Sequence, residues 1–228
     1  MLVVVTGASG GLGSYVAQEL YETHDVVGTY HTNWDGMPRL CREVRLDVTD
    51  ERVVNQFAAD VVKGWGENGI CLLNMAGIPS ARVVHKTTLA DWVRVLDVNL
   101  TGSFLLCKAL LPAMRANGGR IINFSSVTVQ MGVPGAGAYA ASKAGIEALT
   151  KVIAMENAKY PVTANCLSLG YFDRGMIDDV PEETRASLVT TIPVGHLGDP
   201  SNIVSAVRFL MEADYVTGQV IAINGGLR

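Results

Sequence analysis

Short apolar runs recur along the chain and are separated by longer stretches whose apolar residues recur with a helical period. Most of the short runs are rich in Val, Ile and Leu and lack a polar residue at every second position. This pattern is typical of strands that are covered on both faces of a parallel sheet. It predicts strands at 2–6, 25–30, 43–48, 70–76, 120–126, 162–169 and 218–224.

The longer stretches predict helices at 11–23, 50–63, 89–116, 137–158 and 200–213. Strands and helices that alternate in this way form parallel sheets through right-handed crossover connections. We therefore predict an α/β fold, a doubly wound, Rossmann-like, mostly parallel seven-stranded sheet with helices on both faces. No linker-like or low-complexity stretch divides the sequence, so residues 1–228 are predicted to form a single domain.

One segment, at about 170–199, interrupts the alternation with proline, glycine and charged residues. It is too long for an ordinary connection between a strand and a helix. We interpret it as a mobile lid over a substrate site, with short helices of its own.

The composition narrows the class of protein. The chain is 49% hydrophobic and 18% charged, which suits a large buried core and argues against a disordered chain. The formal net charge is -4 and no long basic run occurs, so we expect no nucleic-acid partner. The N-terminus has no basic flank and no charge-free apolar run reaches 18 residues. We therefore expect no signal peptide, no membrane span and a cytoplasmic location.

The cysteines and histidines give no sign of a metal site. The four cysteines are far apart in the sequence, without a Cys-x-x-Cys pair, and the four histidines are scattered. In a long chain without a secretion signal, such cysteines are expected to be reduced and buried.

A glycine-rich turn, TGASGGLG at 6–13, ends the first predicted strand and opens the first predicted helix. Its glycines remove side chains where a pyrophosphate would approach backbone N–H groups at a helix N-terminus. A plain glycine-rich turn is the alternative, but the position at the start of an α/β alternation favours a nucleotide site.

Further motifs follow this turn in order. They are DVT at 47–49, NMAG at 74–77, DVNLTG at 97–102, Ser126 thirteen residues before Tyr139, YAASK at 139–143, and TGQVIAINGG at 217–226. With these motifs the sequence resembles, over essentially its whole length, the short-chain dehydrogenases/reductases of the compact single-domain type. The resemblance implies hydride transfer between a nicotinamide and a carbonyl or alcohol.

The resemblance also implies catalytic roles for Asn99, Ser126, Tyr139 and Lys143. Tyr139 would give a proton to the oxygen of the reduced carbonyl, and Ser126 would orient that oxygen. Lys143 lies four residues after Tyr139, hence beside it on a helix. Its charge, with that of the oxidised nicotinamide, would lower the pKa of the phenol, and it would hold the nicotinamide ribose. Asn99 would fix the local backbone and a water that relays protons.

Each of these residues also has an ordinary structural interpretation. Tyr139 could be a half-buried helix tyrosine, Lys143 a solvated lysine, and Asn99 a residue that bonds to its own backbone. Ser126 could be a turn residue, with Ser125 as the competing candidate. The shared register of the set favours the catalytic interpretation.

For the cofactor, the resemblance implies contacts from the glycine turn, the ends of several strands, the catalytic helix and the start of the lid. The residues are Thr6, Gly7, Ser9, Gly11, Leu12, Gly13, His31, Thr32, Asp47, Val48, Asn74, Ala76, Gly77, Tyr139, Lys143, Gly170 and Phe172.

NADP(H) is favoured over NAD(H), because Tyr30 stands where many NAD-dependent relatives carry an acidic residue. His31 and Thr32 can donate hydrogen bonds to a 2′-phosphate. The turn has Gly10 where NADPH-dependent relatives often carry arginine. A plain surface turn at 28–33, in an enzyme that uses either cofactor, is the alternative.

The substrate is expected to be a small carbonyl compound. Residues 192–210 resemble the 3-oxoacyl-[acyl-carrier-protein] reductases, which implies a 3-oxoacyl thioester, free or on a carrier protein. A sugar, steroid or other ketone, oxidation of an alcohol, and a cofactor-binding regulator without turnover remain as alternatives.

Several positions depart from the family's pattern. Leu169 replaces a proline, and Arg174 replaces a threonine near the nicotinamide. Arg174 could face an anionic substrate or simply be solvated. Carrier-protein reductases tend to carry arginines at two further positions, here Asn117 and Tyr160. Arg115 and Lys159 are adjacent in sequence and could supply the charge that docks an acidic carrier.

The predicted helices at 89–116 and 137–158 carry apolar residues on more than one face. The resemblance implies that they pack against the same helices of a partner, giving a homotetramer, with a dimer as the alternative. One domain could also bury both faces by itself.

Overall fold

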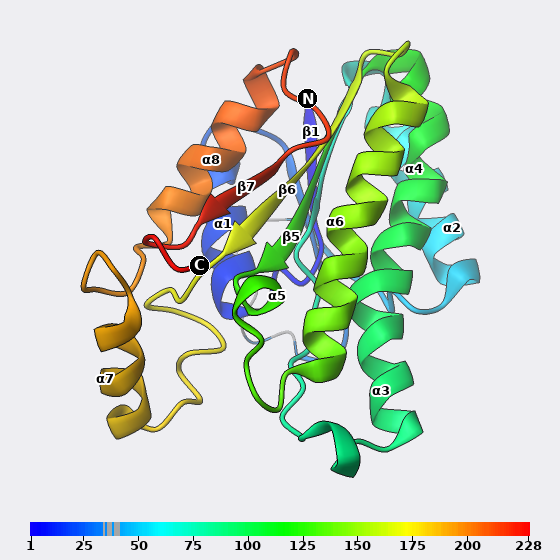
Figure 1. Cartoon of the computed structure of the whole chain (residues 1–228). Coiled ribbons are helices and arrows are strands. Elements are labelled where there is room, and N and C mark those ends of the chain that lie inside the picture. The colour runs from blue at the N-terminus through cyan, green and yellow to red at the C-terminus, as the bar shows by residue number, and fades with distance from the viewer. Residues whose placement is uncertain (34, 36–37, 39–41) are drawn as a thin grey trace.

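The computed structural model describes residues 1–33, 35, 38 and 42–228. Within these residues seven strands form one parallel sheet in the order β3-β2-β1-β4-β5-β6-β7 (Figure 1). The strands are β1 (Leu2–Val5), β2 (Val26–Tyr30), β3 (Arg42–Arg45), β4 (Ile70–Asn74), β5 (Gly119–Ser126), β6 (Val162–Leu169) and β7 (Val220–Ile223). The predicted fold class is confirmed, and every strand pair is parallel.

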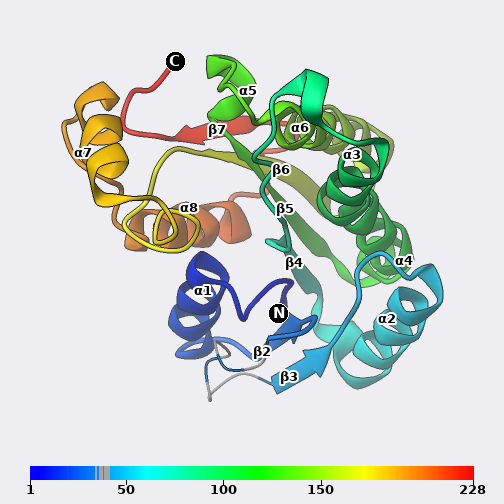
Figure 2. The same ribbon diagram turned by 90° about the horizontal axis from the view of Figure 1, so that it is seen from below.

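Two hydrophobic cores, one on each face of the sheet, explain why the strands lack an apolar–polar alternation. In β1, Val4 packs into one core, while Val3 and Val5 pack into the other. Helices α1 (Gly11–Tyr21) and α8 (Ser201–Glu212) cover one face (Figure 2). Helices α2 (Glu51–Trp65), α4 (Gly102–Asn117) and α6 (Gly137–Asn157) cover the other.

The helix predicted at 89–116 forms, but it has a break. It consists of α3 (Leu89–Leu96), a π-helical turn at Asp97–Thr101 and α4. Such turns are often found at functional sites, and this one contains the predicted site residue Asn99. The shorter elements are 3₁₀ turns at Gly66–Asn68 and Val84–Lys86 and the helix α5 (Thr128–Met131).

The stretch Leu89–Asn117 is, by length and composition, the one part of the described chain apolar enough to cross a membrane. From the sequence we expect no membrane span. About 44% of the apolar window is buried inside the fold, and Leu106, Leu110 and Met114 belong to the core. A single helix of this kind is therefore weak evidence for a membrane.

The 170–199 segment leaves the end of β6, forms a bridge between Phe172 and Gly198, and contains α7 (Glu182–Thr191). In Figure 1 it is the yellow-to-orange part beside the lower end of α1. The prediction that it contains a short helix is confirmed by α7, which has no buried residue.

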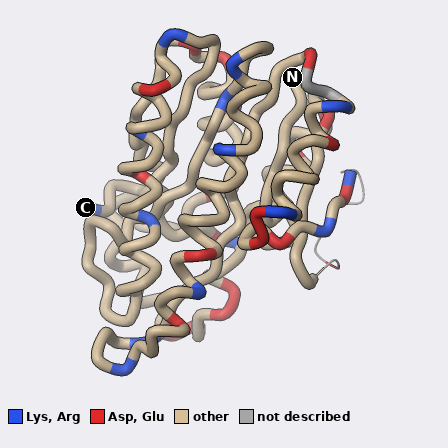
Figure 3. Tube along the Cα trace, turned by 90° about the vertical axis from the view of Figure 1, so that its right-hand side faces the viewer, with Lys and Arg blue, Asp and Glu red and all other residues tan. Residues whose placement is uncertain are grey.

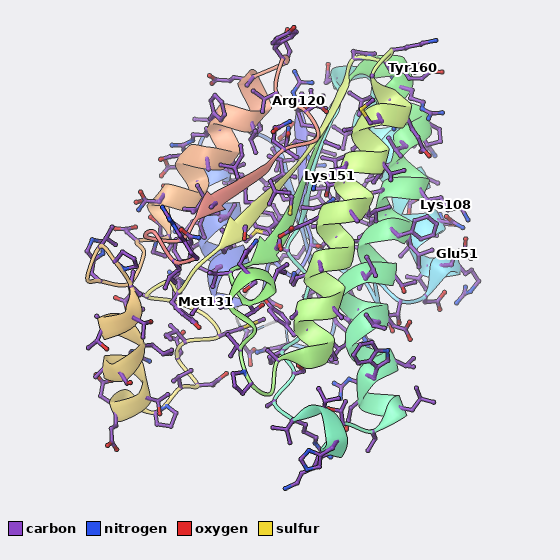
Figure 4. All side chains as sticks on the ribbon, in the orientation of Figure 1. Glu51, Lys108, Arg120, Met131, Lys151 and Tyr160 are labelled. Carbon is purple, nitrogen blue, oxygen red and sulfur yellow. The ribbon has the colours of Figure 1, made fainter. Side chains whose placement is uncertain are left out.

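Charged residues of both signs are interspersed along the trace (Figure 3). One ion pair joins neighbouring helices, because the Nζ atom of Lys108 on α4 donates to Glu51 on α2 at 2.7 Å (Figure 4). Three cysteines are free and buried, namely Cys71, Cys107 and Cys166. Cys41 lies outside the described residues.

Candidate active site

Tyr139 and Lys143 lie in the first two turns of α6, next to the carboxyl end of β5. The Nζ atom of Lys143 donates a 2.7 Å hydrogen bond to the carbonyl oxygen of Phe124 on β5. It lies 5.6 Å from the centroid of the Tyr139 ring. Lys143 is only 6% exposed, so the interpretation of this residue as a solvated helix lysine is wrong.

Ser126, the last residue of β5, faces Tyr139, while Ser125 faces the interior. The Ser126 hydroxyl accepts a 3.3 Å hydrogen bond from the N–H of Thr128 and lies near enough to the Tyr139 phenol to lower its pKa by hydrogen bonding. The Ser125 hydroxyl donates to Glu147 at 2.6 Å. Neighbouring strand residues point to opposite faces, so Ser126, and not its competitor, shares the site with Tyr139.

Burial sets the pKa of both titratable groups. It lowers the pKa of Lys143 to about 8 because the charged ammonium is desolvated. It raises the pKa of Tyr139, although the hydrogen bond with Ser126 acts in the opposite direction. This rise differs from what we expect from the sequence, namely that the charges of Lys143 and of the nicotinamide lower the pKa of Tyr139. In the protein itself, burial outweighs any help from Lys143.

Asn99 links the end of β4 to the catalytic helix. Its Oδ1 atom accepts from the N–H of Ile78 at 2.8 Å. Its Nδ2 atom donates to the Ile78 carbonyl at 3.0 Å and to the Ser142 hydroxyl at 3.1 Å. Ser142 in turn donates to the carbonyl of Tyr139 at 2.7 Å. The Asn99 side chain therefore does not bond to its own backbone, which was the alternative interpretation.

The glycine turn is held close to β4 and keeps its surface free of side chains. Gly7 has a φ of 67°, and a Cβ on it would lie 2.9 Å from the Cα of Ala76. A Cβ on Gly13 would overlap the Gly7 carbonyl oxygen. Thr6 fixes the turn by accepting from the N–H of Ala76 at 3.0 Å.

This turn fits a dinucleotide pyrophosphate. The residue before α1, Gly10, has no side chain that could cap the helix, and the first turn of α1 holds no acidic residue. The first N–H groups of a helix have no partner within the helix itself. An anion can therefore approach them, as the glycine pattern predicts.

Three side chains gather where β2 and β3 end. The Nε2 atom of His31 lies 3.5 Å from the Asp47 carboxylate. Hydrogen bonds from the Thr49 side chain and backbone lower the pKa of Asp47. Arg45 pairs with Tyr30 in the sheet, and its Nε atom donates to the His31 carbonyl at 3.2 Å.

Comparison with known proteins agrees with this geometry. A family model described as enoyl-(acyl carrier protein) reductase matches residues 7–228. Nodulation protein G of Rhizobium sp. (strain N33) is 36% identical over 98% of this chain and 95% of its own. The 3-oxoacyl-[acyl-carrier-protein] reductase FabG of Vibrio cholerae is 35% identical over 99% and 96%, and that of Thermotoga maritima is 32% identical over 98% and 96%.

The chain belongs to the short-chain dehydrogenase/reductase family. It is an NAD(P)-dependent oxidoreductase that acts on CH–OH and C=O groups.

As a short-chain dehydrogenase/reductase, the chain departs from the family's pattern most clearly at Arg174. This residue is exposed, as the solvated alternative expects, but its side chain also rests against α1. Its guanidinium carbon lies 5.5 Å from the centroid of the Tyr15 ring, and its Nη2 atom lies 3.4 Å from the Ser14 hydroxyl. Both partners belong to the first turns of α1, at the glycine turn.

Several residues predicted to contact the cofactor also pack within the protein. Asn74 donates to Asn123 at 2.8 Å across β4 and β5. Val48 packs against Gly102, Gly170 against Asn224, and Phe172 against Gly198. These contacts explain part of why each residue type is present, and the cofactor contacts stay predictions. The remaining members of the predicted set lie in the glycine turn and the start of α1 (Ser9 and Leu12), after the end of β2 (Thr32) and after the end of β4 (Gly77).

Sequence reasoning missed two features of this site. One is Arg45, although its position two residues before Asp47, on the strand beside β2, could have drawn attention to it. The other is Ser80, whose hydroxyl accepts from the N–H of Tyr139 at 3.3 Å and so helps to hold the start of α6. Among the described residues, no group of three or more His, Cys, Asp or Glu side chains could hold a metal ion.

Proposed function

We propose that this short-chain dehydrogenase/reductase reduces a 3-oxoacyl thioester, or a similar small ketone, with NADP(H). The observation that carries the proposal is the contact of the Tyr139 phenol with Ser126, next to the buried ammonium of Lys143. This cluster matches what a carbonyl oxygen needs when its carbon accepts a hydride.

The chemistry follows from the positions of the side chains. When bound, the nicotinamide supplies the hydride. The carbonyl oxygen then gains negative charge, and Ser126 donates a hydrogen bond to it. Tyr139 transfers its phenolic proton to that oxygen. Because burial keeps the pKa of Tyr139 above its ordinary value, the phenol carries its proton at neutral pH, as a proton donor must.

Lys143 and Asn99 act through Tyr139. The Lys143 ammonium stabilises the phenolate that remains after proton transfer and binds the nicotinamide ribose. Asn99, through Ser142, holds the backbone carbonyl of Tyr139. This hydrogen-bond chain supports a positioning role for Asn99, in addition to the water relay that the family resemblance implies.

A buried lysine also argues against the alternative of a regulator without turnover. Moving an ammonium out of water costs free energy unless the group is well paired. The hydrogen bond that the Lys143 Nζ atom donates goes to the neutral carbonyl of Phe124. Binding of the nicotinamide ribose by itself does not need an ammonium beside a phenol, whereas a reductase does.

The preference for NADP(H) rests on the end of β2. No carboxylate stands at Tyr30, and the cationic Arg45 lies beside His31. We propose that His31, Thr32 and Arg45 bind the 2′-phosphate, and that Asp47 faces the adenine. The pyrophosphate would lie on the glycine turn.

The matched family model is described by an enoyl reduction, whereas two of the three relatives above are named for a 3-oxoacyl reduction. The first adds hydrogen across a C=C bond and the second across a C=O bond. Ser126 and Tyr139 together place two hydroxyl donors at one point, which suits a developing alkoxide. We therefore propose the carbonyl as the reacting group. A sugar or steroid ketone stays the alternative substrate, because the same core serves many carbonyls.

Docking of a carrier protein would need a second subunit. Asn117 and Tyr160 lie at the end of the sheet where β5 and β6 begin, and Ser126 lies at the other end of β5 (Figure 4). Eight strand residues separate these ends by roughly 25 Å. The guanidinium carbon of Arg115 stacks 4.8 Å from the centroid of the Tyr160 ring. These residues could reach an active-site entrance only in a neighbouring subunit.

The outer faces of α4 and α6 support such an assembly. They expose Phe104 (43%), Val152 (52%) and Met155 (78%). Exposed apolar side chains on adjacent helices mark a surface that a partner can bury. We propose a homotetramer, with a dimer as the alternative, located in the cytoplasm, in which the 170–199 segment acts as a lid over the substrate.

The test is the loss of reduced-nicotinamide absorbance with NADPH and with NADH. The substrates are acetoacetyl thioester, the matching crotonyl thioester and a panel of sugar and steroid ketones. The proposal expects turnover of the acetoacetyl thioester with NADPH and little with the crotonyl thioester. Turnover of the crotonyl thioester alone would refute carbonyl reduction, and turnover of a sugar or steroid alone would refute the thioester.

A further inference from the structure

The 170–199 segment touches the glycine turn directly. Gly11, in the turn, and Gly175 approach each other so closely that a Cβ on Gly11 would overlap the Cα of Gly175. The side chain of Arg174 begins at the same place, because its Cγ would lie 3.4 Å from that Cβ. Residues more than 160 positions apart in the sequence thus share one surface.

The guanidinium of Arg174 ends over the first turns of α1. It lies on the ring of Tyr15 and beside the hydroxyl of Ser14. Ser14 itself donates to the Gly11 carbonyl at 3.1 Å. Within the described part of the chain, no carboxylate lies at ion-pair distance from Arg174. The charge of this arginine is therefore available to an anion.

The glycine turn contains no cationic side chain. Its eight residues, 6–13, include neither lysine nor arginine. A pyrophosphate that bound there would meet only backbone N–H groups and the dipole of α1, which are partial charges. A guanidinium, in contrast, offers a full charge and a fork of N–H donors that matches phosphate oxygens.

From these contacts we infer that Arg174 binds the pyrophosphate of the cofactor and so couples the position of the 170–199 segment to cofactor binding. The inference rests on the proposed function, because it needs a dinucleotide on the glycine turn. Arg174 is then a binding residue supplied by the segment that follows β6.

The test compares ligands that carry or lack a pyrophosphate. The affinities of NADP⁺, ADP and adenosine 2′-monophosphate are measured by competition with NADPH fluorescence, using the full chain. Charge-assisted hydrogen bonds lead us to expect that Arg174→Gln weakens NADP⁺ and ADP about ten- to a hundredfold. Adenosine 2′-monophosphate should change less than about twofold, because it has no pyrophosphate. Arg174→Lys should restore part of the loss.

A matched control removes the same charge elsewhere. Arg52 lies on α2 with its side chain 87% exposed, and Arg52→Gln should leave all three affinities unchanged. Equal affinities of wild type and Arg174→Gln for NADP⁺ and ADP would overturn the inference and leave the proposed function intact. An equal loss for adenosine 2′-monophosphate would also overturn it. A wild-type protein that binds none of the nucleotides would overturn both.

The coupling to the segment has its own measurement. A protease specific for glutamate can cleave at Glu182 and Glu183, which are exposed in the first turn of α7. Saturating NADP⁺ should slow this cleavage in the wild type but much less in Arg174→Gln. Equal protection of both proteins at saturation would contradict the coupling.

Discussion

The ammonium of Lys143 lies 5.6 Å from the centroid of the Tyr139 ring, and both side chains are held against the end of β5. Lys143 is buried and Tyr139 is half-buried, so desolvation moves their two pKa values in opposite directions from the ordinary values. That of the lysine falls to about 8, and that of the tyrosine rises. The phenol therefore keeps its proton at neutral pH, and the lysine still carries most of its charge.

The burial of Lys143 predicts a dependence of stability on pH. Below pH 8 the folded and unfolded states both carry the proton, and the folded state pays the full cost of desolvation. Between pH 8 and the ordinary pKa near 10.5, only the unfolded state keeps the proton. The unfolding free energy should therefore rise with pH in this window, by up to about 3 kcal/mol.

Denaturant unfolding of wild type and Lys143→Met, from pH 7 to 10.5, measures this contribution as the difference between their unfolding free energies. The unfolding free energy of the wild type should increase relative to that of the variant as the pH rises above 8. Lys151→Met is the control, because Lys151 is exposed on the same helix, and it should give a constant difference. A difference between wild type and Lys143→Met that stays constant with pH would mean that the pKa of Lys143 is not lowered.

Asn99 should matter for both stability and rate. Asn99→Ala leaves the N–H and carbonyl of Ile78 and the Ser142 hydroxyl without their partner. We expect a loss of about 1–3 kcal/mol in unfolding free energy and a fall in kcat larger than any rise in KM, because Tyr139 loses its support. Asn99→Asp, which keeps the acceptor for the Ile78 N–H, should recover part of the stability. An unchanged kcat in Asn99→Ala would exclude the positioning role.

The end of β2 should determine the choice of cofactor. Arg45→Gln removes a cation beside His31, and His31→Asp adds a negative charge where the 2′-phosphate is proposed to bind. Both variants should weaken NADPH far more than NADH, with His31→Asp the stronger, because like charges repel. Fluorescence titration with the two cofactors measures this ratio, and equal effects on both would refute the 2′-phosphate assignment.

The glycine turn should not tolerate a methyl group at Gly13. A Cβ there would overlap the Gly7 carbonyl oxygen, so Gly13→Ala should distort the turn and reduce dinucleotide affinity at least tenfold. Gly64→Ala, at a helical position with open space around it, should be neutral or stabilising by about 0.5–1 kcal/mol. Normal dinucleotide binding by Gly13→Ala would place the pyrophosphate elsewhere.

The sequence predicted the sheet and its helices because burial on both faces leaves a direct mark on residue types. The strand at Leu2–Val5 is a continuous apolar run for this reason, and every residue of Val162–Leu169 is buried. The family motifs, in turn, predicted that Ser126, Tyr139 and Lys143 share one site.

What the sequence could not predict depends on contacts between distant residues. The hydrogen bond of Asn99 to Ile78 spans 21 positions and accompanies a π-helical turn that no periodicity reveals. The rise in the pKa of Tyr139 follows from burial, which depends on tertiary packing. The position of Arg174 over α1 depends on the path of the whole 170–199 segment.

The most direct test of the account is turnover of acetoacetyl thioester by wild type and Tyr139→Phe, followed by the loss of NADPH absorbance. Binding of NADPH is measured in parallel by fluorescence. The substitution removes the proton donor and little else, so turnover should fall at least about a thousandfold while the affinity for NADPH changes less than about threefold. Turnover that survives in Tyr139→Phe would contradict the assignment of Tyr139 as the proton donor.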